Sequence, residues 1–167
     1  MKQQLNSILY VSLLAILVLL CFTGCYPGKA VSTASKVEIA QAIDADAWKF
    51  TALFMNPQYG RSGNVNGSYL VKFEKGKMEV DLPYIGRAYG GAEVMSGRSP
   101  LYFTTTDFRV EKEQDKKGAW VITIKPKGYN EVQIFLFTLQ DNGRAELNVQ
   151  LTNRSPVSFR GIIDPVK

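Results

Sequence analysis

The segment LPYIGRAYGG, residues 82–91, carries the side chains of this chain that are best suited to bind another molecule. It contains Tyr84, Arg87 and Tyr89, and Arg98 follows shortly after it. Two phenols and two guanidinium groups suit a ligand that combines an anionic group with a flat or apolar body. The sequence therefore predicts these four residues as a binding site at the mouth of the fold.

A structural role explains the same loop, residues 83–100, without any ligand. Pro83 ends a strand pattern, and Gly86, Gly90 and Gly91 suit backbone conformations that other residues avoid. The tyrosines would then plug one end of the domain, and the arginine would bond to carbonyl groups. The length of the loop favours a function, because ordered loops longer than about 12 to 15 residues are uncommon and are often functional.

Side chains for catalysis or metal binding are scarce. The chain has no histidine and only two cysteines, Cys21 and Cys25. This excludes the usual Ser-His and Cys-His nucleophile pairs and the common transition-metal sites. Asp44 and Asp46 lie at the end of a predicted helix and Asp81 lies in a predicted strand, and these carboxylates form no recognisable catalytic pair. We expect no catalytic residue, no cofactor and no metal, and hence a protein that is not an enzyme.

The first 24 residues have the pattern of a signal peptide. A basic start is followed by an almost unbroken apolar run from Ile8 to Phe22 and then by small residues. The run is short for a helix that crosses about 30 Å of hydrocarbon. We therefore expect residues 1–24 to be removed.

The residues FTGC, ending at Cys25, resemble the lipobox of bacterial lipoproteins. The resemblance implies a diacylglycerol group on the Cys25 sulfur and cleavage before it; the alternative is an ordinary secretory signal with an incidental cysteine. Residues 25–35 would then be a flexible tether. In Bacteroidetes lipoproteins, acidic residues after the cysteine commonly direct export to the cell surface. The residues here, from Tyr26 to Lys29, are not acidic, which favours a lipid-anchored protein of the cell envelope that faces the periplasm.

The charge of the chain argues against nucleic acid as a partner. The formal net charge is +5, but basic and acidic residues alternate and no block of like charge occurs. We expect solvated faces, contact with the membrane through the anchor, and no nucleic-acid binding.

Residues 36–167 are predicted to form a single β domain with one helix at its N-terminus. Ser35 and Glu38 form a capping box before a helical apolar pattern from about Lys36 to Asp46. About eight strands follow with a turn signal roughly every ten residues. Short connections predict an antiparallel meander that curls into a curved sheet or barrel. IFLFTL, residues 134–139, is apolar on both faces, so we expect a central strand whose outer side the helix covers.

The mature region resembles family 4251, a domain of unknown function found in small Bacteroidetes lipoproteins. The resemblance rests on LPYxGRAY, residues 82–89, and on NGxAxLxVxxxxRxxxxFxG, residues 142–161. Ile85 departs from the family, where phenylalanine is common at this position. The resemblance implies a lipocalin-like antiparallel β fold with an N-terminal helix, and it assigns no activity.

Two functions remain open from the sequence. The first is non-catalytic binding of a small apolar or amphipathic ligand inside the barrel or at its mouth. The second is a structural or protein-binding module of the cell envelope, recognised through an edge strand or through the YIGRAYGG loop.

Overall fold

The computed structural model describes residues 34–66, 68–89 and 99–166. The predicted signal peptide, Cys25, most of the predicted tether and Arg98 lie outside the described residues. Of the helices within those ranges, none is long and apolar enough to cross a membrane.

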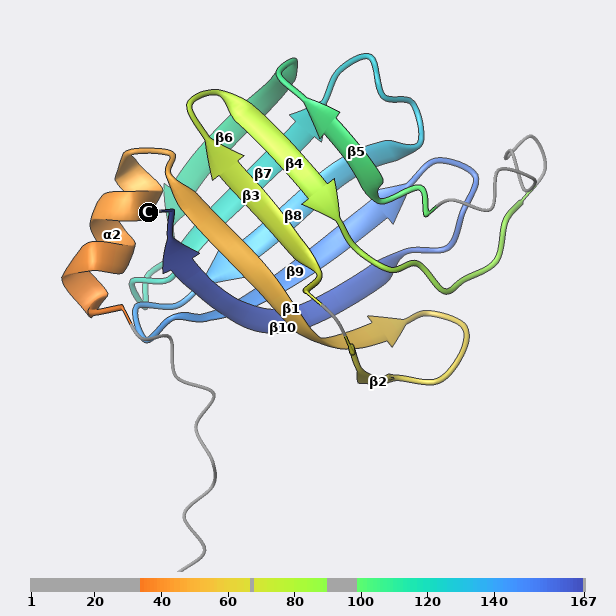
Figure 1. Cartoon of the computed structure of the whole chain (residues 1–167), viewed down its shortest axis with the longest axis horizontal. Helices are drawn as coiled ribbons and strands as arrows, with labels where there is room; N and C mark the ends of the chain where they lie inside the picture. The colour runs from red at the N-terminus through yellow and green to blue at the C-terminus, as the bar shows by residue number, and fades with distance from the viewer. Residues whose placement is uncertain (1–33, 67, 90–98, 167) are drawn as a thin grey trace, which may run out of the picture.

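Ten strands form one antiparallel sheet that curls into a nearly closed barrel (Figure 1). This confirms the predicted fold class. Nine strands follow in the order β5-β4-β3-β1-β10-β9-β8-β7-β6, and the short β2 pairs with β1. The strands are β1 (Trp48–Pro57), β2 (Gly63–Asn64), β3 (Leu70–Glu74), β4 (Lys77–Asp81), β5 (Tyr102–Thr105), β6 (Phe108–Gln114), β7 (Trp120–Pro126), β8 (Val132–Leu139), β9 (Arg144–Leu151) and β10 (Val157–Pro165).

The barrel consists of two meanders that meet where the first strand pairs with the last. β1 pairs with β10 along nearly their whole length, and the remaining seam lies between β5 and β6. The segment LYFTTTDFRVEKE, residues 101–113, does not form one continuous strand, because it breaks at Thr106 and Asp107 into β5 and β6. A hydrogen bond from the Asp107 amide to Thr105 Oγ1 stabilises the break at 3.1 Å.

The helix α2 (Lys36–Asp44) begins as its capping box predicts. The Ser35 side chain accepts a hydrogen bond from the Glu38 amide, and the Glu38 carboxylate accepts one from the Ser35 amide at 2.7 Å. The helix buries Ile39 and Ile43 and packs against β10 and β1 at one end of the barrel (Figure 1). The sequence predicted that the helix covers the outer side of β8, and this is wrong. Its short apolar stripe packs on β10 and β1 and closes one end of the barrel instead.

Aromatic side chains fill the interior of the barrel. The Phe50 and Phe137 rings, from β1 and β8, meet edge to face at 5.8 Å between centroids. Because β10 and β9 separate these two strands in the sheet, the contact crosses the interior. Six large aromatic side chains are at most 2% exposed: Trp48, Phe50, Phe73, Phe135, Phe137 and Phe159. The interior of the barrel is therefore a packed hydrophobic core.

Candidate functional site

The loop after β4 is tied to the loop between β9 and β10 at the end of the barrel away from α2 (Figure 1). The Arg87 amide donates to Ser155 Oγ and the Ser155 amide donates to the Arg87 carbonyl, both at 2.9 Å. The Tyr89 amide donates to the Asn153 carbonyl at 2.7 Å. Ser155 is fully buried. These bonds fix the backbone of the described part of the loop from Arg87 to Tyr89.

The Tyr84 side chain makes its polar contacts inside this junction. Its hydroxyl lies 2.9 Å from the Ser155 carbonyl and 3.1 Å from Ser155 Oγ. The Arg154 guanidinium lies 5.8 Å from the centre of the Tyr84 ring, and its Nε lies 3.3 Å from Glu131 Oε2. Tyr84 therefore joins the two loops, as the structural interpretation of the loop proposes.

Gly86 is required by the same junction. A Cβ at this position would run into the Tyr84 hydroxyl and Ser155 Oγ. The glycine in the LPYIGRAY motif thus lets the loop approach closely, which supports the structural interpretation for this residue.

Arg87 and Tyr89 instead face outward, where they meet Tyr59 from the turn after β1. The Arg87 guanidinium lies 4.3 Å from the centre of the Tyr59 ring. Desolvation, and then a hydrogen bond with the Tyr59 side chain, raise the pKa of Tyr89 above its usual value. Ile85 lies beside them, and its Cγ2 is 3.1 Å from where a Cβ on Gly60 would stand.

We call Tyr59, Ile85, Arg87 and Tyr89 the rim patch. The exposed fractions of its large apolar side chains are 38% for Tyr59, 49% for Ile85 and 48% for Tyr89. Of the four predicted site residues, two lie in this patch, Tyr84 is turned to Ser155, and Arg98 lies outside the described residues. The sequence did not single out Tyr59 as a site residue, although Tyr59 is an aromatic residue within the turn signal NPQYGRSGN.

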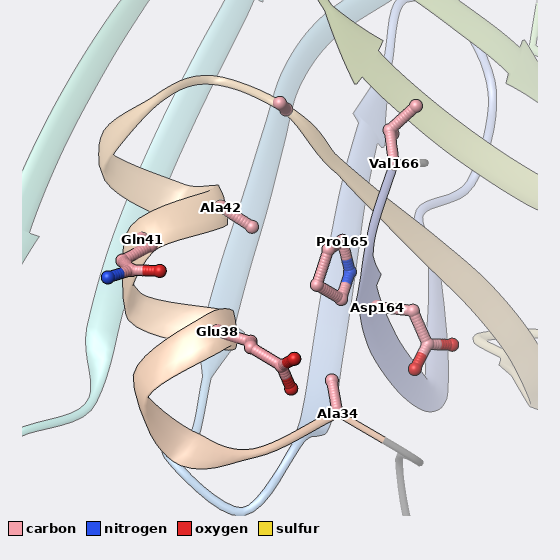
Figure 2. A pocket seen from close by; sticks show the side chains of 8 residues that line it. Ala34, Glu38, Gln41, Ala42, Asp164, Pro165 and Val166 are labelled. Carbon is pink, nitrogen blue, oxygen red and sulfur yellow. The ribbon is translucent and has the colours of Figure 1, made fainter.

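Three hollows formed by described residues lie outside the barrel. One of about 490 Å³ separates α2 from the end of β10, where the Glu38 and Asp164 carboxylates flank it (Figure 2). Two more, of about 400 and 430 Å³, adjoin each other across β1, β10 and β9. None of these three is lined by a predicted site residue. Within the described ranges, no three acidic, histidine or cysteine side chains cluster as metal ligands.

These features define a class of small, single-sheet β-barrels with a filled interior and a polar-aromatic rim. Residues 30–163 match the domain of unknown function DUF4251, and the chain belongs to this family. A crystal structure of a DUF4251 family protein from Bacteroides eggerthii DSM 20697 has a similar fold. It is 15% identical, the match covers 78% of this chain and 87% of that one, and the TM-score is 0.54. No protein with a curated description matches.

Proposed function

We propose that this protein is a lipid-anchored module of the cell envelope that binds a protein partner through the rim patch. The observation that carries the proposal is the patch itself: Tyr59, Ile85, Arg87 and Tyr89 lie together, exposed, on a backbone fixed by hydrogen bonds. Tyrosine and arginine are enriched among the residues that dominate protein interfaces. A fixed backbone lowers the entropy cost of binding.

The packed interior favours a protein partner over the small ligand that the sequence also predicts. A ligand inside the barrel would have to displace rings such as Trp48 and Phe50, which have no exposed surface. Such rings contribute several kcal/mol to stability, of order 3–5 kcal/mol each when truncated. The exposed aromatic and arginine side chains of the rim patch line none of the three hollows, which suits a protein surface better than a small molecule that needs a concave site. The proposal is of a binding module without catalytic residues.

The placement of the rim patch is consistent with an anchor at Cys25. The described chain begins at Ala34, beside α2, and the rim patch lies at the opposite end of the barrel (Figure 1). A lipid on Cys25 would lie within about 30 Å of Ala34 even with the tether extended. The rim patch would then point away from the membrane, toward partners in the periplasm.

Photo-crosslinking in living host cells tests the proposal. We expect a photoreactive phenylalanine analogue in place of Tyr89 to give one discrete protein adduct. Tyr102, on β5, provides a matched control because it is a tyrosine of similar exposure, 52%, outside the rim patch. Adducts at position 102 alone, or none at position 89, would refute the assignment of the partner to the rim patch.

A further inference from the structure

A shallow trough crosses the outside of the barrel next to the rim patch. Its two hollows share Phe54, Glu146 and Arg160, so they form one continuous surface over β1, β10 and β9. Asn56 and Ser62 line the end that adjoins the turn bearing Tyr59. The trough is further lined by Leu53, Gln140, Arg144, Ala145, Asn148, Ser158, Phe159 and Gly161.

A β-bulge in β1 gives the trough its apolar side. The pairing of β1 with β10 shifts between Ala52 and Phe54, so Leu53 is an extra residue in its strand. Ala52 and Met55 on either side are buried, while Leu53 is 40% exposed and Phe54 half-buried. The bulge thus turns two consecutive apolar side chains outward, where alternation alone would allow one.

The two arginines of the trough, Arg144 and Arg160, form no ion pair within the described part of the chain. Arg144 and Arg160 have no carboxylate oxygen within 4.0 Å there, although Glu146 lies opposite Arg160 in the strand register. Arg160 is held in place by the Phe54 ring, whose centre lies 4.5 Å from its guanidinium carbon. The charged side chains that line the trough are these two arginines and Glu146, so the trough keeps an excess of positive charge that favours a ligand with carboxylates.

The spacing of these arginines indicates the form of the ligand. Arg144 pairs with Ile162, two residues beyond Arg160, so the two arginines are diagonal neighbours on one face. Such neighbours lie about 7–8 Å apart. In an extended peptide, residues i and i+2 lie about 6.7 Å apart on one face. Two acidic residues separated by one residue would therefore reach both guanidinium groups.

We infer that the trough binds an extended acidic segment of the protein partner. Carboxylates at positions i and i+2 lie on Arg144 and Arg160, and a neighbouring apolar side chain packs on Leu53 and Phe54. Amide side chains such as Asn148 can hydrogen bond to the peptide backbone. This inference rests on the proposed function and adds the chemical class of the partner.

Fluorescence polarisation with the full-length protein tests the inference. The probe is a fluorescein-labelled ten-residue peptide with one Glu-Ser-Glu sequence and a flanking leucine. We expect saturable binding that weakens with added salt. The double variant R144Q/R160Q should bind about tenfold more weakly, because it loses two charge-assisted contacts. A Lys-Ser-Lys peptide should not bind.

Lys116 and Lys117 provide the matched control. They lie exposed in the turn between β6 and β7, away from the trough, and the variant K116Q/K117Q removes the same charge. It should bind the Glu-Ser-Glu peptide as the unchanged protein does. Equal losses in both double variants, no binding of the Glu-Ser-Glu peptide, or unchanged binding by R144Q/R160Q would overturn the inference.

The photo-crosslinking at position 89 separates this inference from the proposed function. If the adduct at position 89 persists while the peptide fails to bind, the trough inference is wrong and the rim patch stands. If position 89 gives no adduct while the peptide binds the trough, the proposed role of the rim patch fails on its own.

Discussion

Gly161→Ala is expected to lower the free energy of unfolding by about 3 kcal/mol, the upper end of the usual cost of overpacking. A Cβ at Gly161 would overlap the Thr51 carbonyl oxygen and would stand 2.9 Å from Phe50 Cε2. The carbonyl belongs to β1, the partner strand of β10, and cannot move without disturbing the pairing that joins the two meanders. Phe50 has no exposed surface, so its ring has little room to yield.

Gly63→Ala is the matched control for this prediction. Gly63 also lies in a strand of the sheet, but a Cβ there would meet nothing within 4 Å. We expect its stability to stay within about 0.5 kcal/mol of the unchanged protein. Urea or thermal denaturation measures both variants. Equal stability of the two variants would contradict the close packing of β10 against β1 at Gly161.

Ser155→Ala is expected to lower the free energy of unfolding by about 1–3 kcal/mol, the cost of leaving a buried donor without an acceptor. The variant removes the oxygen that accepts from the Arg87 amide at 2.9 Å and lies 3.1 Å from the Tyr84 hydroxyl. Ser155 is the one polar residue among the fully buried side chains of the described chain. We also expect crosslinking from position 89 to fall, because this junction positions the rim patch.

Ser158→Ala makes the corresponding control. Its hydroxyl donates to the Asn56 carbonyl at 3.2 Å in an exposed position, so water can replace the bond. A loss of about 0.5 kcal/mol or less is expected there. Comparable losses of unfolding free energy in the two variants would contradict the structural role of the buried serine. Full crosslinking in Ser155→Ala would show that the rim patch does not depend on this serine.

Local sequence signals predicted the parts of the fold that depend on neighbouring residues. The capping box of Ser35 and Glu38 placed the start of α2. The turn between β3 and β4 consists of Lys75 and Gly76, and glycine is typical of such turns. Both turn residues have positive φ, 53° and 73°. Alternating hydrophobicity identified most strands, because a barrel wall has one buried and one solvated face.

Features that depend on distant contacts were not predicted. The break between β5 and β6 falls in a run of threonines followed by Asp107, without glycine or proline, and threonine is also favoured in strands, so the sequence marks the break only weakly. The bulge at Leu53 depends on the register with β10, more than a hundred residues away along the chain. The role of Tyr84 was likewise hidden, because its partner Ser155 belongs to another loop.

The candidate site was predicted in part for the same reason. Residue types singled out Arg87 and Tyr89, and the fold brings both to the rim patch. Tyr59 joins them from the turn after β1, and only the antiparallel arrangement of the barrel places that turn beside the loop after β4. The sequence could not distinguish the tyrosine that plugs the junction from the tyrosine that faces outward.

Native mass spectrometry of the protein, extracted from host membranes in mild detergent, tests the central claim most directly. We propose that the barrel is filled, is anchored through Cys25 and works through its outer surface. We therefore expect the mass of a chain that begins at an acylated Cys25, alone or with a protein partner, and without a small ligand. A stoichiometric small molecule that persists until the barrel unfolds would contradict the filled interior, and an unmodified chain from Met1 would contradict the anchor.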